Sequence, residues 1–356
     1  MKITAVEAWL VDMRLVRPYT AAYDTIETTA NVFLRLVTDR RTVGYGCAAP
    51  AEHDTGESPD TLLAIIRSVV EPTIKGADPL RPALLHERLH QVLAEEPSLR
   101  AAVDMALWDI YAKKCDVPLW KLLGGYRDRI ATSVTVGILP EKEAVAKARE
   151  WAARGFSIIK LKGGLDAQAD VARVFKIREA LGEHAVLRFD ANEGYDVEQA
   201  LWFIDQTRPA RIEILEQPTP KGNFDLLGQV TRRADVPVMA DESLTTLRDA
   251  FRLTAGDLVD MLNVKLMKVG GIAEATEINS VAKAAGAPVM IGCMDESALG
   301  IAAALSFALS DSNVAYADLD GHLDLTKDDP AAGAVEIQGG MMLANERPGL
   351  GVELSA

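Results

Sequence analysis

The chain has 356 residues, of which 49% are hydrophobic, and its formal net charge is −14 at pH 7. A chain of this length exceeds one average domain and suits a large domain joined to a second one. The negative charge argues against nucleic acid or an anionic membrane as a partner, because both need basic patches. The three cysteines form no CxxC pair and the N-terminus has no continuous apolar segment, so we expect a protein of the reducing cytoplasm.

The N-terminal part of the chain predicts strands followed by helices. Residues 3–10 and 31–38 alternate apolar and polar side chains, which is typical of antiparallel strands. The second of these continues through a turn into residues 42–45 and predicts a hairpin. From residue 59 to residue 114, apolar side chains recur at helical spacing. We therefore expect an α+β domain over residues 1–125.

The rest of the chain predicts a barrel of alternating strands and helices. Eight short apolar segments begin 24 to 28 residues apart, and the segments between them carry apolar stripes at helical spacing. Such alternation is typical of a parallel sheet covered by helices, and eight units close a (β/α)₈ barrel. A count of seven stays open, because the first and last units are usually the least regular. The expected strands are 132–136, 157–162, 185–190, 212–216, 237–241, 261–265, 288–292 and 315–319.

The domain boundaries follow from this change of pattern. We expect an α+β capping domain over residues 1–125 and the barrel over residues 126–323. The tail, residues 324–356, is polar with Gly-Gly and Pro-Gly turns, and we expect it to pack back on the capping domain. No low-complexity linker separates the two domains, so the site is expected between the cap and the carboxyl ends of the barrel strands. A homo-oligomer is compatible with the sequence, which does not determine the oligomeric state.

Three carboxylates lie at the ends of neighbouring predicted strands. Asp190, Glu216 and Asp241 each follow an apolar segment, and a buried carboxylate needs a partner because burying an isolated charge is costly. Three convergent carboxylates without a nearby histidine or cysteine suit a hard cation, Mg²⁺ first and Mn²⁺ second. The alternative, in which each carboxylate separately caps a helix or pairs with an arginine, leaves their matching positions unexplained. We therefore predict a metal site.

Two lysines end the second and sixth predicted strands, roughly opposite each other in an eight-strand ring. A lysine that acts as a base near pH 7 must lose its proton about three units below its reference pKa of ~10.4. A metal dication and a second ammonium favour this loss. Lys160 points to the same side of its strand as Lys162 and is expected to be that second cation. Lys162 and Lys265 facing each other across a metal-bound substrate predict racemisation or epimerisation, with Mg²⁺ stabilising the enediolate.

Five short motifs surround these side chains: Lys160-Leu161-Lys162, Asp190-Ala191-Asn192, Glu216-Gln217-Pro218, Asp241-Glu242-Ser243 and residues 263–268 (NVKLMK). Together they resemble the enolase superfamily, in its muconate-lactonising-enzyme subgroup, over essentially the whole chain. Sites of that superfamily pair a lysine or histidine base with Mg²⁺. The resemblance implies that the two strand-end lysines form the acid/base pair, that the three carboxylates bind Mg²⁺, and that Lys268 has a secondary role.

The last strand discriminates between reactions of this subgroup, which include cycloisomerases, o-succinylbenzoate synthases, N-acylamino acid racemases and dipeptide epimerases. Asp318 and Asp320 resemble the Asp-x-Asp of the dipeptide epimerases, whose aspartates hold the α-ammonium of the dipeptide. A free ammonium needs anionic acceptors, whereas an N-acylated substrate would leave both unpaired. We therefore predict a Mg²⁺-dependent dipeptide epimerase that uses two lysine bases. An N-acylamino acid racemase or another subgroup enzyme is the alternative, and a non-catalytic metal-binding scaffold is a remote one.

Acidic residues in the predicted loops indicate which dipeptide is preferred. Asp24 stands where members specific for Ala-Glu carry an arginine, Glu52 lies in the second cap loop, and Asp295 follows the seventh strand. Thr135, in the first barrel strand, is a further candidate substrate-binding residue. If these acids line the pocket, a lysine or arginine at the C-terminal position of the dipeptide is their natural complement. The alternative is that Asp24 and Glu52 face solvent, as most acids in loops do.

Overall fold

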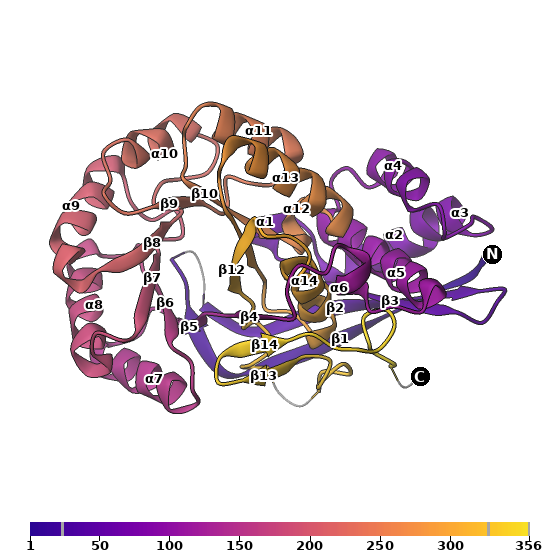
Figure 1. Cartoon of the computed structure of the whole chain (residues 1–356), viewed down its shortest axis with the longest axis horizontal. Coiled ribbons are helices and arrows are strands. Elements are labelled where there is room, and N and C mark those ends of the chain that lie inside the picture. Colours follow the sequence, from indigo (N-terminus) through magenta and orange to yellow (C-terminus); the bar gives the residue numbers. More distant parts are fainter. Residues whose placement is uncertain (23–24, 326–327, 355–356) are drawn as a thin grey trace.

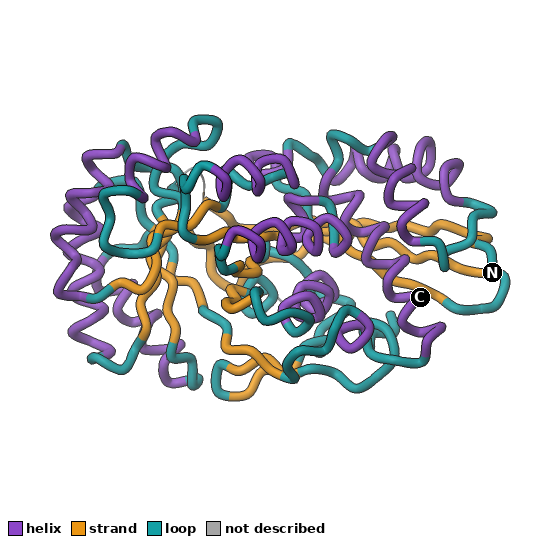
Figure 2. The backbone as a smooth tube through the Cα atoms, turned by 45° about the horizontal axis from the view of Figure 1, so that its top comes forward, coloured by secondary structure: helices purple, strands orange, loops and turns teal. Residues whose placement is uncertain are grey.

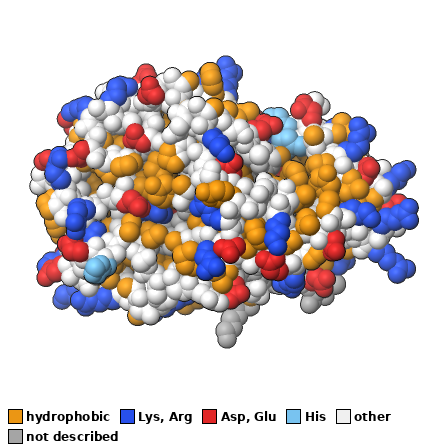
Figure 3. Space-filling view, in the orientation of Figure 1, with side chains coloured by type: hydrophobic (Ala, Val, Ile, Leu, Met, Phe, Trp, Pro, Cys, Tyr) orange, Lys and Arg blue, Asp and Glu red, His pale blue; other side chains and the backbone are white. Residues whose placement is uncertain are grey.

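A computed structural model of the protein describes residues 1–22, 25–325 and 328–354. The barrel strands stand at one end of the molecule inside helices, and a long antiparallel sheet with its own helices extends to the other end (Figures 1 and 2). Over the face seen in Figure 3, acidic and basic side chains are interspersed with apolar ones. No helix among the described residues is both long and apolar enough to cross a membrane.

An antiparallel sheet in the order β1-β2-β3 forms the framework of the N-terminal region. The first two strands are longer than predicted, because their pairing shifts register after Arg14 and resumes at Tyr19. The end of this hairpin therefore reaches the barrel, where the Ile138 amide donates to the Thr20 carbonyl at 2.8 Å. The strands are β1 (Ile3–Thr20), β2 (Thr25–Thr38) and β3 (Val43–Ala48).

Helices cover this sheet through apolar side chains, as the helical spacing after residue 59 predicts. The longest of them, α5, crosses β3 so closely that a Cβ on Gly46 would overlap the carbonyl of Ala102. Leu62, Ile66 and Val70 join the same core from the preceding helices. The helices are α1 (Glu52–Thr55), α2 (Pro59–Ile65), a π-helical turn (Ile66–Val70), α3 (Glu71–Ile74), α4 (Pro82–Val92), α5 (Pro97–Cys115) and α6 (Leu119–Leu122).

Eight parallel strands, in consecutive order from β5 to β12, form the barrel. The ring is closed by a parallel bridge between Thr132 and Ala317, where the Ser133 amide donates to the Ala317 carbonyl at 3.1 Å. The predicted eight units are therefore confirmed, and the count of seven is wrong. The strands are β5 (Val134–Val136), β6 (Ile158–Lys162), β7 (Val186–Asp190), β8 (Ile212–Glu216), β9 (Val238–Ala240), β10 (Met261–Lys265), β11 (Val289–Gly292) and β12 (Val314–Asp318).

Helices between the strands shield the barrel from solvent (Figure 1). In α9, for example, a capping box formed by Asp196 and Gln199 starts the helix, and Phe203 lies in the core. α14 is buried along its whole length, because it contacts both β12 and the cap strand β3. The helices are α7 (Glu141–Ala153), α8 (Ala167–Leu181), α9 (Val197–Thr207), a 3₁₀ turn (Arg208–Ala210), α10 (Phe224–Thr231), α11 (Leu247–Ala255), α12 (Leu266–Val269), α13 (Ile272–Ala285) and α14 (Ala298–Ala308).

The C-terminal tail contacts both parts of the molecule. Its strands β13 (Glu336–Gln338) and β14 (Met341–Leu343) form a small sheet with β4 (Arg129–Ala131). The indole of Trp120 donates to the Asn345 carbonyl at 2.8 Å, which joins the tail to the cap. We keep the division into a cap of residues 1–125 and 324–356 and a barrel of residues 126–323 as a proposal, because β4 lies in the barrel range and yet pairs with the tail.

Candidate active site

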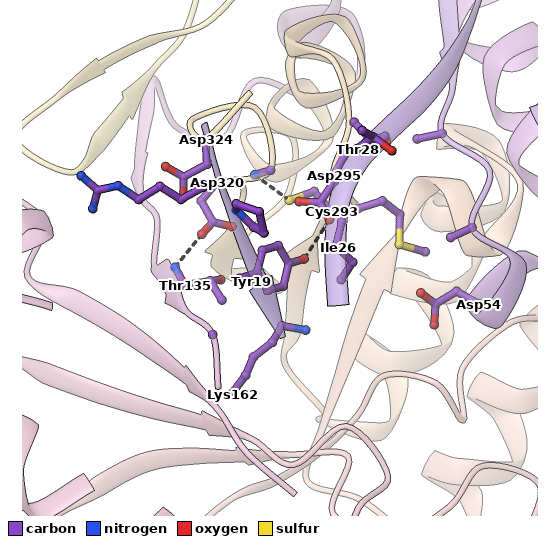
Figure 4. A pocket seen from close by; sticks show the side chains of 18 of the residues that line it. Tyr19, Ile26, Thr28, Asp54, Thr135, Lys162, Cys293, Asp295, Asp320 and Asp324 are labelled. Carbon is purple, nitrogen blue, oxygen red and sulfur yellow. Dashed lines mark hydrogen bonds between the residues drawn. The ribbon is translucent and has the colours of Figure 1, made fainter. Parts of the chain in front are cut away.

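A cavity of about 820 Å³ lies where the cap meets the carboxyl ends of the barrel strands. Its wall comes from both parts of the chain, as the sequence predicts for a capped barrel. Figure 4 shows Tyr19, Ile26 and Thr28 from the cap hairpin above Lys162 of the barrel. The charged groups that line the cavity are Arg17, Glu52, His53, Asp54, Glu57, Glu143, Lys147, Glu150, Lys160, Lys162, Lys265, Asp295, Asp318, Asp320 and Asp324.

The three predicted carboxylates converge beneath this cavity. In the parallel ladder Lys162 lies beside Asp190 and Asp190 beside Glu216, so these side chains share one height and one direction. Asp190, Glu216 and Asp241 are buried, and one oxygen of each lies within 4.8 Å of the others. Burial, followed by the charge of Asp190, raises the pKa of Glu216 to about 8. Such crowding of acids fits a divalent cation, because carboxylate oxygens are the ligands that Mg²⁺ prefers.

Lys160 is surrounded by carboxylates at the barrel interior. Its Nζ atom lies 2.5 Å from Asp318 Oδ2 and 3.4 Å from both Asp190 Oδ2 and Glu216 Oε2. Burial lowers the pKa of Lys160, but the charges of Asp318, Glu216 and Asp190 outweigh this effect and raise it well above its usual value. Lys160 is therefore a permanent cation in this structure. It occupies the position that the sequence predicts for a second ammonium near Lys162.

Lys162 and Lys265 stand on β6 and β10, which are four strands apart in the ring of eight and therefore opposite each other. Lys162 Nζ donates to Asn192 Oδ1 at 3.0 Å and lies 3.7 Å from Asp190 Oδ2. Lys265 Nζ lies 2.8 Å from Asp241 Oδ2. Burial lowers the pKa of Lys265, but Asp241 outweighs it and raises that pKa well above its usual value. A dication bound at Asp241 would oppose this rise, because nearby positive charge disfavours the ammonium form.

The two aspartates of the last strand occupy different environments. Asp318 is buried, with one oxygen at Lys160 and the other accepting from Ser133 Oγ at 2.5 Å. Asp320 lines the cavity, and its Oδ2 accepts from the Thr135 amide at 2.6 Å. Burial, followed by the charge of Asp318, raises the pKa of Asp320 to about 7. The sequence treats the two residues as equivalent, whereas the structure commits Asp318 to Lys160.

The predicted specificity residues are brought together only in part. Glu52 and Asp295 line the cavity, while Asp24 lies outside the described residues. Asp295 Oδ2 accepts from the Tyr19 hydroxyl at 2.8 Å, so one of its oxygens is occupied by the cap. The sequence analysis missed Tyr19 and Asp54, which also line the cavity. Asp54 follows Glu52 by two residues and could have been found from that spacing, but nothing in the sequence indicates the contact of Tyr19.

A (β/α)₈ barrel whose strand ends present three carboxylates and opposed lysines beneath an α+β cap defines a metal-dependent enzyme of the enolase-like class. The chain belongs to the mandelate racemase/muconate lactonizing enzyme family of that class. Residues 5–124 match the model of the mandelate racemase/muconate lactonizing enzyme N-terminal domain, and residues 143–356 match that of the enolase C-terminal domain-like family.

Curated relatives of similar length act on dipeptides by name. The chain is 40% identical to the L-Lys-D/L-Arg epimerase of Desulforapulum autotrophicum, over 99% of both chains. It is 38% identical to the L-Ala-D/L-Glu epimerase of Bacillus subtilis, over 99% of this chain and 97% of that protein. Its fold is similar to the crystal structure of a dipeptide epimerase from Methylococcus capsulatus complexed with Mg and L-Arg-D-Lys. That comparison has a TM-score of 0.94 and 38% identity, and covers 98% of this chain and 99% of the other.

Proposed function

We propose that this protein is a Mg²⁺-dependent dipeptide epimerase that inverts the α-carbon next to the dipeptide's carboxylate. The observation that carries the proposal is the position of Lys162 and Lys265 on opposite strands, with a carboxylate cluster between them. Each lysine serves one face of the α-carbon. One removes the α-proton, and the other returns a proton to the opposite face. An enzyme with a single base returns the proton to the face it left and cannot invert the centre.

The other buried groups assist this transfer. Asp190, Glu216 and Asp241 would hold Mg²⁺, and the bound dication supplies positive charge beside the substrate carboxylate, which favours release of the neighbouring proton. Lys160, which stays protonated among its carboxylates, adds a second positive charge on the side of Lys162. The cap excludes water from the cavity, which strengthens these electrostatic effects.

Recognition of a free ammonium distinguishes a dipeptide from an N-acylated amino acid. Asp320 lines the cavity next to Asp318, and the pair presents negative charge to the N-terminal end of the substrate. The Thr135 amide holds one oxygen of Asp320 in place. An N-acyl group would bury these carboxylates without a cationic partner, which is unfavourable.

We further propose that a cationic C-terminal residue is preferred. In Figure 4, Asp54 lies at one side of the cavity and Asp320 and Asp324 at the other, so acids face both ends of a bound dipeptide. Glu52 lies on the same short helix as Asp54, and Asp295 lies over the reacting lysines, whose charges lower its pKa while burial raises it. A guanidinium or ammonium would form charge-assisted hydrogen bonds with these acids, each worth about 1.5–3 kcal/mol and less where solvent reaches them. Relatives named for Lys and Arg dipeptides support this preference.

A dipeptide library in D₂O tests the function directly. The protein is incubated with Mg²⁺ and free dipeptides, and deuterium uptake at the α-carbon is read by mass spectrometry. The same dipeptides with acetylated N-termini are the matched control. We expect uptake into free dipeptides, with those ending in Lys or Arg labelled fastest. Equal or faster uptake into the acetylated set would favour an N-acylamino acid racemase, and no uptake into either set would refute the epimerase.

A further inference from the structure

The amines of the two opposed lysines are held by different kinds of partner. Lys265 Nζ lies 2.8 Å from a charged oxygen of Asp241. Lys162 Nζ instead makes its shorter contact, at 3.0 Å, with the neutral amide oxygen of Asn192, while Asp190 Oδ2 lies 3.7 Å away. In the described part of the chain, no neutral side chain takes the same place beside Lys265. The two lysines are therefore not equivalent, although the sequence presents them as a matched pair.

Asn192 is fixed in place from three directions. Its backbone has a φ of 41°, in the left-handed region that residues other than glycine rarely adopt. Its backbone amide donates to Asp190 Oδ1 at 2.9 Å, and its side-chain Nδ2 donates to Glu242 Oε1 at 3.0 Å. The side chain is buried and does not line the cavity. Asn192 therefore has no contact with a substrate and acts, if at all, through Lys162.

The orientation of the Asn192 amide is determined by its two neighbours. With Nδ2 at Glu242, the oxygen faces the amine of Lys162 and accepts from it. Turning the amide over would place its NH₂ group against the lysine amine, so that two donors would meet. The loop that carries Asn192 packs tightly on the loop after β6, since a Cβ on Gly194 would overlap the carbonyl of Gly164. The hydrogen-bond acceptor is thereby held at a constant position relative to the strand of Lys162.

We propose that Asn192, supported by Glu242, is a positioning residue for Lys162 alone. Because Lys162 donates one hydrogen to Asn192, the remaining substituents of Nζ, including the lone pair of the neutral amine, point elsewhere, and Lys162 itself lines the cavity. Asn192 thus sets the direction in which this base meets the substrate. The inference rests on the proposed function, since it treats Lys162 as one of two bases.

The variant Asn192→Gly isolates the amide. Glycine adopts the left-handed backbone without strain and keeps the amide that donates to Asp190, so only the contact with Lys162 is lost. The variant is combined separately with Lys265→Ala and with Lys162→Ala, which leave one base each. Deuterium exchange at the α-carbon of both dipeptide epimers is then measured with Mg²⁺ in D₂O. Exposed Asn223→Gly serves as the matched control for the substitution itself.

We expect Asn192→Gly to slow exchange by about 10- to 100-fold in the Lys265→Ala background, because misplacing a reacting group by about 1 Å has effects of that size. In the Lys162→Ala background the opposite epimer should exchange within about threefold of its parent. Mg²⁺ affinity, measured by calorimetry, should stay within about threefold, as should all rates with Asn223→Gly. Equal slowing in both backgrounds, or no slowing with Lys162 alone, overturns the inference. Exchange in neither parent background overturns the two-base function and the inference with it.

Discussion

Replacing Asp241 by Asn should damage folding and metal binding through two separable effects. The side chain of Asp241 is fully buried and contacts two ammonium groups, those of Lys265 and Lys268. Burial opposes its ionisation, but the charges of Lys265 and Lys268 prevail and hold the pKa of Asp241 well below its usual range. Asparagine neutralises neither lysine. The side chain of Lys268 is only 1% exposed, so its ammonium would become an uncompensated buried charge.

The size of each effect follows from this geometry. Removing one partner of a buried ion pair typically lowers the free energy of unfolding by about 3–5 kcal/mol, and we expect a loss of that order for Asp241→Asn. Mg²⁺ at 100 times its dissociation constant should raise the free energy of unfolding of the unmodified protein by about 2.7 kcal/mol. Asp241→Asn should lose this gain, because a carboxylate of the proposed metal site is gone.

Urea unfolding followed by circular dichroism, with and without Mg²⁺, measures both effects. The double variant Asp241→Asn/Lys268→Met separates them: removing the unpaired ammonium should restore part of the stability but none of the Mg²⁺-dependent gain. Exposed Asp225→Asn is the control and should change either value by less than about 0.5 kcal/mol. A full Mg²⁺-dependent gain in Asp241→Asn would show that Asp241 is not a metal ligand. A double variant no more stable than the single one would show that the unpaired ammonium is not the cause.

Three further outcomes can be measured by kinetics. Lys162→Ala and Lys265→Ala should each reduce epimerisation at least about 10²-fold, the usual contribution of a general base, and full activity in either would contradict the two-base mechanism. The kcat/KM for Ala-Lys should exceed that for Ala-Glu by ~10-fold or more, equivalent to about 1.4 kcal/mol, and Asp295→Asn should narrow the ratio; a preference for Ala-Glu, or an unchanged ratio, would rule out the charge explanation. Because the pKa of Asp320 is raised to about 7, the carboxylate is lost as pH falls, so KM should rise roughly 10-fold from pH 8 to pH 6. A KM that stays flat over this range, or that keeps the same rise in Asp320→Asn, would exclude Asp320 as the ammonium acceptor.

The barrel and the placement of its charged side chains were determined by the sequence alone. β8 and β10 begin and end where the apolar segments predict, and the other barrel strands differ by no more than two residues at either end. Each strand is an apolar segment whose last residue or next residue is polar, and this pattern is visible locally. Parallel strands place all their carboxyl ends on one side of the barrel, so the convergence of three carboxylates and two lysines followed without knowledge of any contact.

Which of these side chains contact one another was decided only by the tertiary structure. Asp318 and Asp320 look alike in the sequence, yet the first contacts Lys160, and the second contacts the backbone of Thr135. Tyr19 meets Asp295 across 276 residues of chain. Periodicity reports only on neighbours within a few residues, whereas these contacts depend on strand register, on closure of the ring and on docking of the cap. A shift of one residue in any of these would point each side chain to the other face of its strand.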